Sequence, residues 1–202
     1  NLFDTEPVKA TELRNTLRTE LLSFPNRPYQ EFTDTNVDLS VSTENTSILG
    51  KVLAGYQGWF NTPTDGSNRG WQHYKTASGA FEPGEVTVDF WPDMSEADVD
   101  EKYATPFFHK DGSLATVFSS ANIKTVNRHF KWMNDYGIDG VFFQQFASNL
   151  RSNNPKGRAN ALVVFDNIIA GAKANNNRLV SIMYDLSGSN ATGTMVNDIK
   201  QH

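Results

Sequence analysis

The chain has 202 residues, enough to bury a hydrophobic core within one domain. Its net charge of -5 at pH 7 and the lack of a Lys/Arg cluster argue against nucleic acid as a partner, and the absence of cysteine excludes disulfides, thiol nucleophiles and thiolate metal sites. No apolar run approaches the roughly 18 residues of a membrane span, so we expect none.

Residues 1–48 are predicted to form an amino-terminal helix and a polar linker. Leucines recur at helical spacing in residues 8–24, and Pro25 and Pro28 end that pattern. Residues 26–47 are rich in Thr, Asn, Asp and Ser without periodicity, as is typical of a connecting segment. The main domain is therefore expected to span residues 49–202.

Four apolar runs of the main domain end in aromatic and polar residues, and each predicts a strand. They are residues 52–60 (VLAGYQGWF), 86–93 (VTVDFWPD), 140–146 (GVFFQQF) and 179–185 (LVSIMYD). A shorter strand is expected at residues 114–118. The apolar part of each run suits a core, while the polar tail suits a crevice at the carboxyl ends of strands, where loops converge.

Helical patterns separate the later strands. The first covers residues 123–136, with Ser119 or Ser120 as its N-cap and Gly137 in the left-handed conformation beyond its end. Its expected apolar stripe consists of Ile123, Val126, Phe130 and Met133. The second covers residues 159–174, with a stripe of Ala161, Leu162, Phe165, Ile168, Ile169 and Ala172. A further helix is expected at residues 194–201.

This order of elements predicts an α/β fold with parallel strands joined by right-handed crossovers. A doubly wound sheet and a (β/α)8 barrel both fit. A doubly wound nucleotide binder should carry a glycine-rich phosphate turn, and neither G-x-G-x-x-G nor G-x-x-x-x-G-K-[ST] occurs. We therefore predict a TIM-like (β/α)8 barrel, of which only the amino-terminal part is present because a whole barrel takes about 250 residues.

The aromatic and polar tails form a candidate sugar-binding site. Aromatic rings stack on the C–H-rich faces of sugars, while amide, imidazole, hydroxyl and carboxylate groups bind sugar hydroxyls. The candidate residues are Tyr56, Trp59, Trp71, His73, Asp89, Trp91, Gln144, Gln145, Tyr184 and Asp185. The two glutamines are adjacent in a strand, so at most one points into a barrel interior. Core packing of the tryptophans, and a loop-capping role for Asp185, remain the alternatives.

Other chemistry has weaker sequence support. Asp93 and Glu96 would present paired carboxylates, but Ser95 followed by acidic residues equally fits a helix N-cap. The four histidines lack metal-ligand spacing, and His129 falls inside a helix where a structural role is expected. No metal or cofactor is predicted, and no G-x-S-x-G motif supports a serine nucleophile.

Three segments resemble the amino-terminal half of glycoside hydrolases related to families 71 and 99, whose members include xylosidase/arabinosidase-like and endo-mannosidase-related proteins. They are residues 52–60, 88–93 (VDFWPD) and 129–146 (HFKWMNDYGIDGVFFQQF), within a resemblance that covers about residues 51–188. The resemblance implies a (β/α)8 barrel whose sugar cleft is lined by the candidate residues, and hydrolysis by paired carboxylates without a required metal.

The catalytic residues stay unknown. In those relatives the acids lie in an E-x-x-E or D-x-x-E motif on a later strand, and no such motif follows Asp185. The expected function is therefore glycoside hydrolysis, with this chain supplying the first half of the cleft and being inactive alone. The alternative is a non-catalytic glycan-binding protein with the same aromatic cleft. Either way an oligosaccharide or polysaccharide is the expected partner, and that substrate class suggests a periplasmic or extracellular location.

Overall fold

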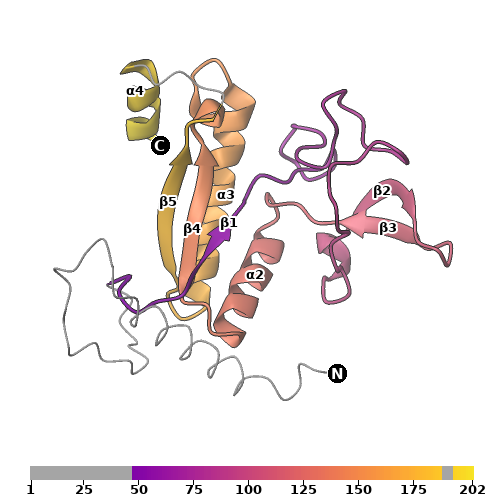
Figure 1. Ribbon diagram of the computed structural model, residues 1–202, viewed down its shortest axis with the longest axis horizontal. Coiled ribbons are helices and arrows are strands. Elements are labelled where there is room, and N and C mark those ends of the chain that lie inside the picture. Colours follow the sequence, from indigo (N-terminus) through magenta and orange to yellow (C-terminus); the bar gives the residue numbers. More distant parts are fainter. Residues whose placement is uncertain (1–46, 188–192) are drawn as a thin grey trace, which may run out of the picture.

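A computed structural model describes residues 47–187 and 193–202, so the helix expected at 8–24 and all but the last residue of the linker expected at 26–47 lie outside the described residues. The described part is a small α/β domain with a three-stranded parallel sheet and a two-stranded antiparallel sheet, which lie to either side of helix α2 (Ile123–Asp135) (Figure 1).

The parallel sheet consists of β1 (Leu53–Tyr56), β4 (Gly140–Phe146) and β5 (Leu179–Asp185), with β4 in the middle. Both neighbouring pairs run parallel. The chain passes from β1 to β4 through the small sheet and α2, and from β4 to β5 through α3 (Pro155–Ala174). The prediction of parallel strands joined by helical crossovers is thus confirmed for this sheet.

The prediction of a TIM-like (β/α)8 barrel, even as its amino-terminal part, is wrong. In the described residues the parallel sheet has three strands in the order β1-β4-β5, and neither of the other two expected barrel strands joins it. Residues 86–93 form no strand, because Val88 and Trp91 pack against the cluster around Phe81 and the Trp91 indole donates to the Thr116 carbonyl. The strand expected at 114–118 pairs antiparallel in the other sheet.

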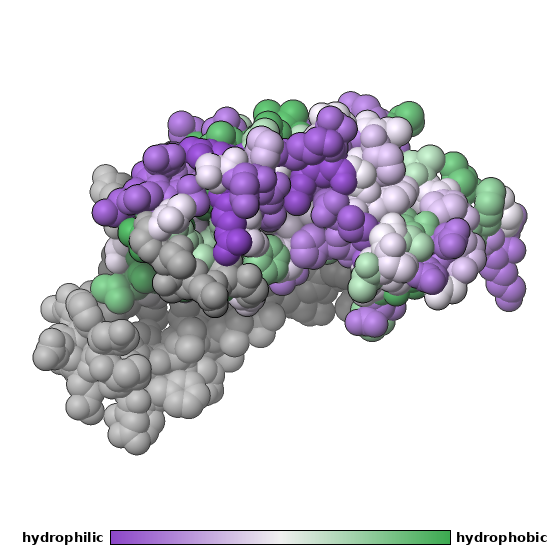
Figure 2. Space-filling view, turned by 90° about the horizontal axis from the view of Figure 1, so that it is seen from above, coloured by the Kyte–Doolittle hydropathy of each residue, from purple (hydrophilic) through white to green (hydrophobic). Residues whose placement is uncertain are grey.

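The small sheet contains β2 (Tyr103–Phe108), which the sequence pattern did not predict, and β3 (Leu114–Val117). Pro106 argues against a strand in a sequence pattern, because proline cannot donate to a ladder. Here it is tolerated because the register shifts between Ala104 and Phe108. Phe108 lies opposite Leu114 at the end of the hairpin; both side chains are exposed, and hydrophobic residues gather at that end of the molecule (Figure 2).

Helices α2 and α3 cover one face of the parallel sheet. Val141 and Phe143 alternate along β4 and point into a core that both helices complete with Val126, Phe130, Met133, Val164, Ile168 and Ala172. The intervening Phe142 points to the other face, as does Met183 of β5, and these side chains are 37% and 44% exposed. The described helices therefore bury only one side of the sheet.

Helix boundaries and phases differ in detail from the prediction. Asn122, rather than Ser119 or Ser120, caps α2 by accepting the backbone N–H groups of Lys124 and Thr125. Two residues of the expected stripes are exposed, namely Ile123 and Leu162, because Thr125 and Val164 hold the buried positions. α3 begins four residues earlier than expected, and α4 (Gly193–Gln201) confirms the last predicted helix.

The turn between α2 and β4 ties the three parallel strands together. Gly137 adopts the predicted left-handed conformation with φ 75°. The Asp139 backbone N–H donates to the Val52 carbonyl, its carboxylate accepts the Val52 N–H, and its carbonyl accepts the Leu179 N–H, each at 2.8–2.9 Å. One residue thus aligns the starts of β1, β4 and β5.

None of the described helices combines the length and the apolar composition needed to cross a membrane.

Candidate functional site

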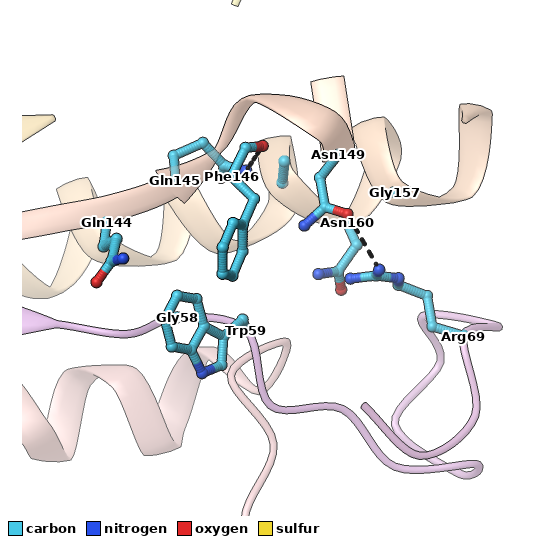
Figure 3. Close-up of a pocket in the computed structure, with 10 residues that line it drawn as sticks. Gly58, Trp59, Arg69, Gln144, Gln145, Phe146, Asn149, Gly157 and Asn160 are labelled. Atoms are coloured by element: carbon cyan, nitrogen blue, oxygen red, sulfur yellow. Dashed lines mark hydrogen bonds between the residues drawn. The ribbon is translucent and has the colours of Figure 1, made fainter. Parts of the chain in front are cut away.

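A small pocket lies at the carboxyl end of β4. It encloses about 250 Å³, including space open to solvent. The loop after β1, the end of β4, the short helix η3 (Ala147–Leu150) and the first turns of α3 contribute to it (Figure 3). Its lining residues are Gly58, Trp59, Arg69, Gln144, Gln145, Phe146, Asn149, Gly157, Asn160 and Ala161.

The aromatic side of the pocket is a stack of three nearly parallel rings. The Trp59 centroid lies 4.6 Å from that of His73 and 4.7 Å from that of Phe146, with interplanar angles of 16° and 22°. Gly58 lets the chain pass close to α3 just before this ring, since a Cβ there would lie 2.6 Å from Val164 Cγ1.

Among the described residues, the stack leaves one face of Trp59 without an aromatic neighbour. The His73 and Phe146 centroids are 5.9 Å apart. Rings on opposite faces of a third ring would be separated by two van der Waals gaps, about 7 Å, so both lie on the same face of Trp59. In the part of the chain that the structure describes, no other ring stacks on Trp59 and no group accepts a hydrogen bond from its indole N–H.

A hydrogen-bonded loop forms the polar side. Asn61 and Gln72 exchange backbone hydrogen bonds that close residues 61–72 into a loop. Inside it, the Asp65 carboxylate accepts the backbone N–H groups of Thr62 and Ser67 and the Ser119 hydroxyl. Burial alone would raise the pKa of Asp65, but these hydrogen bonds outweigh it and lower the pKa, so the carboxylate is ionised at neutral pH.

Arg69 reaches the pocket from this loop and lies beside a row of amides. Its guanidinium donates to the Asn61 and Asn149 side-chain oxygens, both at 3.4 Å. The Asn61 amide in turn donates to Asn160 Oδ1 at 2.9 Å. Figure 3 shows Asn149, Asn160 and Arg69 together on one wall, across from Trp59 and Phe146. An aromatic wall thus faces a wall of hydrogen-bonding groups.

Both glutamines of β4 line the pocket, although their side chains leave opposite faces of the strand, because the pocket lies at the strand end. Gln144 donates to an Asp185 carboxylate oxygen at 2.6 Å, and Gln145 donates to the Phe146 carbonyl at 3.0 Å. Hydrogen bonds from Ser187 and Gln144 lower the pKa of Asp185. An ionised carboxylate therefore adjoins the pocket without lining it.

The structure brings five of the ten candidate residues together and separates the others. Trp59, Gln144 and Gln145 line the pocket, and His73 and Asp185 contact them. The remaining five lie elsewhere. Trp71 and Trp91 both pack against Phe81, Trp71 also against Tyr74 and Trp91 also against Phe107. The Tyr184 hydroxyl forms a hydrogen bond with the His202 ring. Tyr56 is buried against α2, and Asp89 is exposed.

The carboxylates of the D-x-x-E sequence do not form a pair. Asp93 accepts the Ser95 backbone N–H, while Glu96 accepts the Trp132 indole N–H at 2.8 Å. The alternative of an N-cap at Ser95 is also wrong, because the only helical turn there is η2 (Val99–Glu101), which Asp98 precedes.

Within residues 47–187 and 193–202, a single group of three acidic side chains is close enough to share a cation, namely Asp98, Asp100 and Glu101. Two cations of the protein already bind it, because Lys124 contacts both aspartates and Arg128 contacts Asp98 and Glu101. The group fastens η2 to α2.

Tyr56 and His129 form a buried pair between β1 and α2, in line with the structural role expected for His129. The Tyr56 hydroxyl lies 2.9 Å from His129 Nδ1. Burial lowers the pKa of His129 from 6.5 to about 4 and raises that of Tyr56. At neutral pH the neutral imidazole therefore accepts a hydrogen bond from the Tyr56 hydroxyl.

This pair predicts loss of stability in mild acid. Because the folded chain has the lower His129 pKa, the unfolded chain binds more protons between pH 6.5 and about 4, so the stabilisation is complete above pH 6.5 and is lost as the pH falls toward 4. The loss is at most about 3 kcal/mol. Urea unfolding at pH 7 and pH 4.5 measures it, and H129Q should remove most of this pH-dependent part. An equally steep pH dependence in H129Q would contradict the assignment to His129.

The sequence pattern missed Arg69, Phe146, Asn149 and Asn160. The ten residues 61–70 are rich in turn formers, and long loops in compact domains are often functional, so the position of Arg69 in that run is a usable signal. Asn160 falls on the buried stripe of α3, where an amide needs a partner. No local pattern marks Asn149, because only the tertiary fold brings η3 beside the loop.

Comparison with protein-family models finds no match, and neither the curated proteins nor the solved structures include one that is significantly similar to this chain.

Proposed function

We propose that this protein binds a carbohydrate in the pocket at the carboxyl end of β4. The observation that carries the proposal is that one pocket combines the Trp59 indole, on whose second face no ring of the described residues stacks, with the amides and the guanidinium of Asn149, Asn160 and Arg69. A sugar ring has both an apolar face, which suits an indole, and a rim of hydroxyls, which suits amide groups. The resemblance to carbohydrate-active enzymes in residues 52–60 and 129–146 agrees with it.

Glycan binding is tested by titrating the chain with oligosaccharides selected on a glycan array. Wild type is expected to bind, and W59A to bind at least about 10-fold more weakly, because stacking on the indole is lost. W71A is the matched control: Trp71 packs against Phe81 and Tyr74, so its loss should lower the melting temperature and leave the affinity unchanged. Wild type that binds no glycan, or W59A that binds as tightly as wild type, contradicts the proposal.

A second candidate function is hydrolysis of the bound glycan, and the ionised Asp185 next to Gln144 is the observation that favours it. Glycoside hydrolysis takes two carboxylates, one protonated as the acid and one ionised as base or nucleophile. None of the ten pocket residues carries a carboxylate. We therefore propose that the chain alone binds without turnover; release of sugar by wild type, lost in D185N, would establish an activity for Asp185.

A further inference from the structure

Arg69 is the only charged residue among those that line the pocket. It is partly buried, and burial is the main cause that lowers the pKa of its guanidinium. Removing a cation from water costs free energy unless an anion or a set of acceptors replaces the water. The partners of Arg69 therefore indicate what the pocket is built to receive.

No carboxylate of the described residues lies within 4 Å of the Arg69 guanidinium. Asp65 belongs to the same loop, but its oxygens accept hydrogen bonds from Asn61, Thr62, Ser67 and Ser119 instead. Its charge favours the charged form of Arg69 from a distance only. Within residues 47–187 and 193–202, the cation therefore has no contact ion pair.

The hydrogen bonds of Arg69 to described residues use only two of its donors. A guanidinium carries five N–H groups. Only two of them have a side-chain partner among the described residues, Asn61 and Asn149, and both distances are 3.4 Å, longer than the usual 2.9–3.0 Å or so. These two amides hold the guanidinium in place, and its other N–H groups remain for a ligand.

Asn160 adds a second donor that has no partner among the described residues. Its residue is 5% exposed, and its side-chain oxygen accepts from Asn61, but no group in the described part of the chain accepts a hydrogen bond from its amide nitrogen. In Figure 3 it lies next to Arg69 and faces the space beside Trp59. Asn160 stands in the second turn of α3 and lines the pocket together with Arg69.

We propose that the glycan bound here is acidic, and that a sugar carboxylate pairs with Arg69 while the sugar ring stacks on Trp59. The proposal rests on the proposed carbohydrate binding and names its ligand class, a uronic acid residue. The planar guanidinium fork matches the two oxygens of a carboxylate in a bidentate pair. The adjacent Asn160 amide would donate to the same group. A neutral sugar would leave the partly buried cation without an anion.

The test compares three glycan classes on one array: neutral, uronate-containing and sulfated oligosaccharides. Uronate-containing glycans are expected to bind best to wild type. Methyl esterification of the best-binding uronate is expected to weaken its binding to wild type by about 10- to 100-fold. The affinity of R69M for the free acid should be lower than that of wild type by a similar factor. R69M should also bind the acid and its ester equally, which a merely structural role of Arg69 would not produce. The affinity of R69K for the free acid should lie between those of wild type and R69M, because lysine keeps the charge but lacks the planar guanidinium.

The outcomes separate the two proposals. Best binding to a neutral glycan that depends on Trp59 and is unchanged in R69M overturns the acidic ligand and leaves carbohydrate binding in place. Preference for the sulfated class overturns the carboxylate. No binding to any class by folded wild type overturns both. Thermal melting of R69M and R69K confirms that each variant is folded, and R69K retains the test if R69M is not.

Discussion

The free energy of unfolding of the G140A variant is expected to be about 3 kcal/mol lower than that of wild type. Gly140 opens the central strand β4 and pairs with Leu179 of β5. A Cβ at this position would lie 2.2 Å from the Leu179 carbonyl oxygen and 2.5 Å from its Cβ. Because the neighbour is strand backbone, it cannot rotate away, and relief requires separating β4 from β5 at their starts. Overpacking of this kind falls at the upper end of about 1–3 kcal/mol.

Gly55 provides the matched control, because it lies in β1 of the same sheet and nothing is within 4 Å of the Cβ that alanine would add. G55A should change the free energy of unfolding by no more than about 0.5 kcal/mol. Urea unfolding of the three proteins gives both the midpoint and the slope. Equal stability of G140A and G55A would contradict the close approach of Gly140 in β4 to Leu179 in β5.

The R128A variant is expected to lose about 2–4 kcal/mol of stability through an unpaired carboxylate. Glu101 is fully buried and receives three hydrogen bonds from Arg128, at 2.6, 3.0 and 3.1 Å. Burial raises the pKa of Glu101, but hydrogen bonds and charge from Arg128 outweigh it and lower the pKa. Removing the guanidinium leaves this ionised group without its cation, which typically costs about 3–5 kcal/mol. The neighbouring Asp98 is exposed, so the site lies near the surface, and we expect a loss about 1 kcal/mol smaller than that range.

The ion pair between Lys131 and Asp135 is the comparison for Arg128. Both of its side chains are exposed, so K131A should cost less than about 0.5 kcal/mol. In the double variant R128L/E101L the buried charge is absent as well, and we expect much of the R128A loss to be recovered. If R128A is as stable as K131A, the Glu101 carboxylate is hydrated and the assignment of a buried ion pair fails.

The contacts that order the parallel sheet and the loop at residues 61–72 also position the pocket residues. Gly140 aligns β4, and the far end of β4 carries the pocket residues Gln144, Gln145 and Phe146. The loop that presents Arg69 is held by Asp65 and by the bridge between Asn61 and Gln72. These contacts place a cation and an indole on facing walls before any ligand arrives, which reduces the conformational entropy that binding must overcome.

Local elements were predicted well where their patterns depend on neighbours in the sequence. The strands at 140–146 and 179–185 agree with β4 and β5, and the helix predicted at 123–136 agrees with α2 within one residue. Periodicity and the left-handed Gly137 depend only on short-range backbone geometry, so the sequence contains that information.

The larger architecture was not predictable in the same way. An apolar run such as residues 86–93 satisfies the local criteria for a strand, but a strand also needs a partner edge, and the aromatic cluster around Phe81 competes for Val88 and Trp91. Likewise β2 forms despite Pro106, because β3 supplies a partner and a register shift. The barrel prediction failed because it counted strands without knowing which would pair.

The sequence by itself determined the order of α2, β4, α3 and β5, the left-handed Gly137, and three pocket residues, Trp59, Gln144 and Gln145. Only the tertiary structure brought Arg69, Asn149 and Asn160 beside them and separated Trp71 and Trp91 from the site. The physical reason is that alternation and capping act over a few residues, whereas the hydrogen bond from Arg69 to Asn149, 80 positions later, depends on how the whole chain packs.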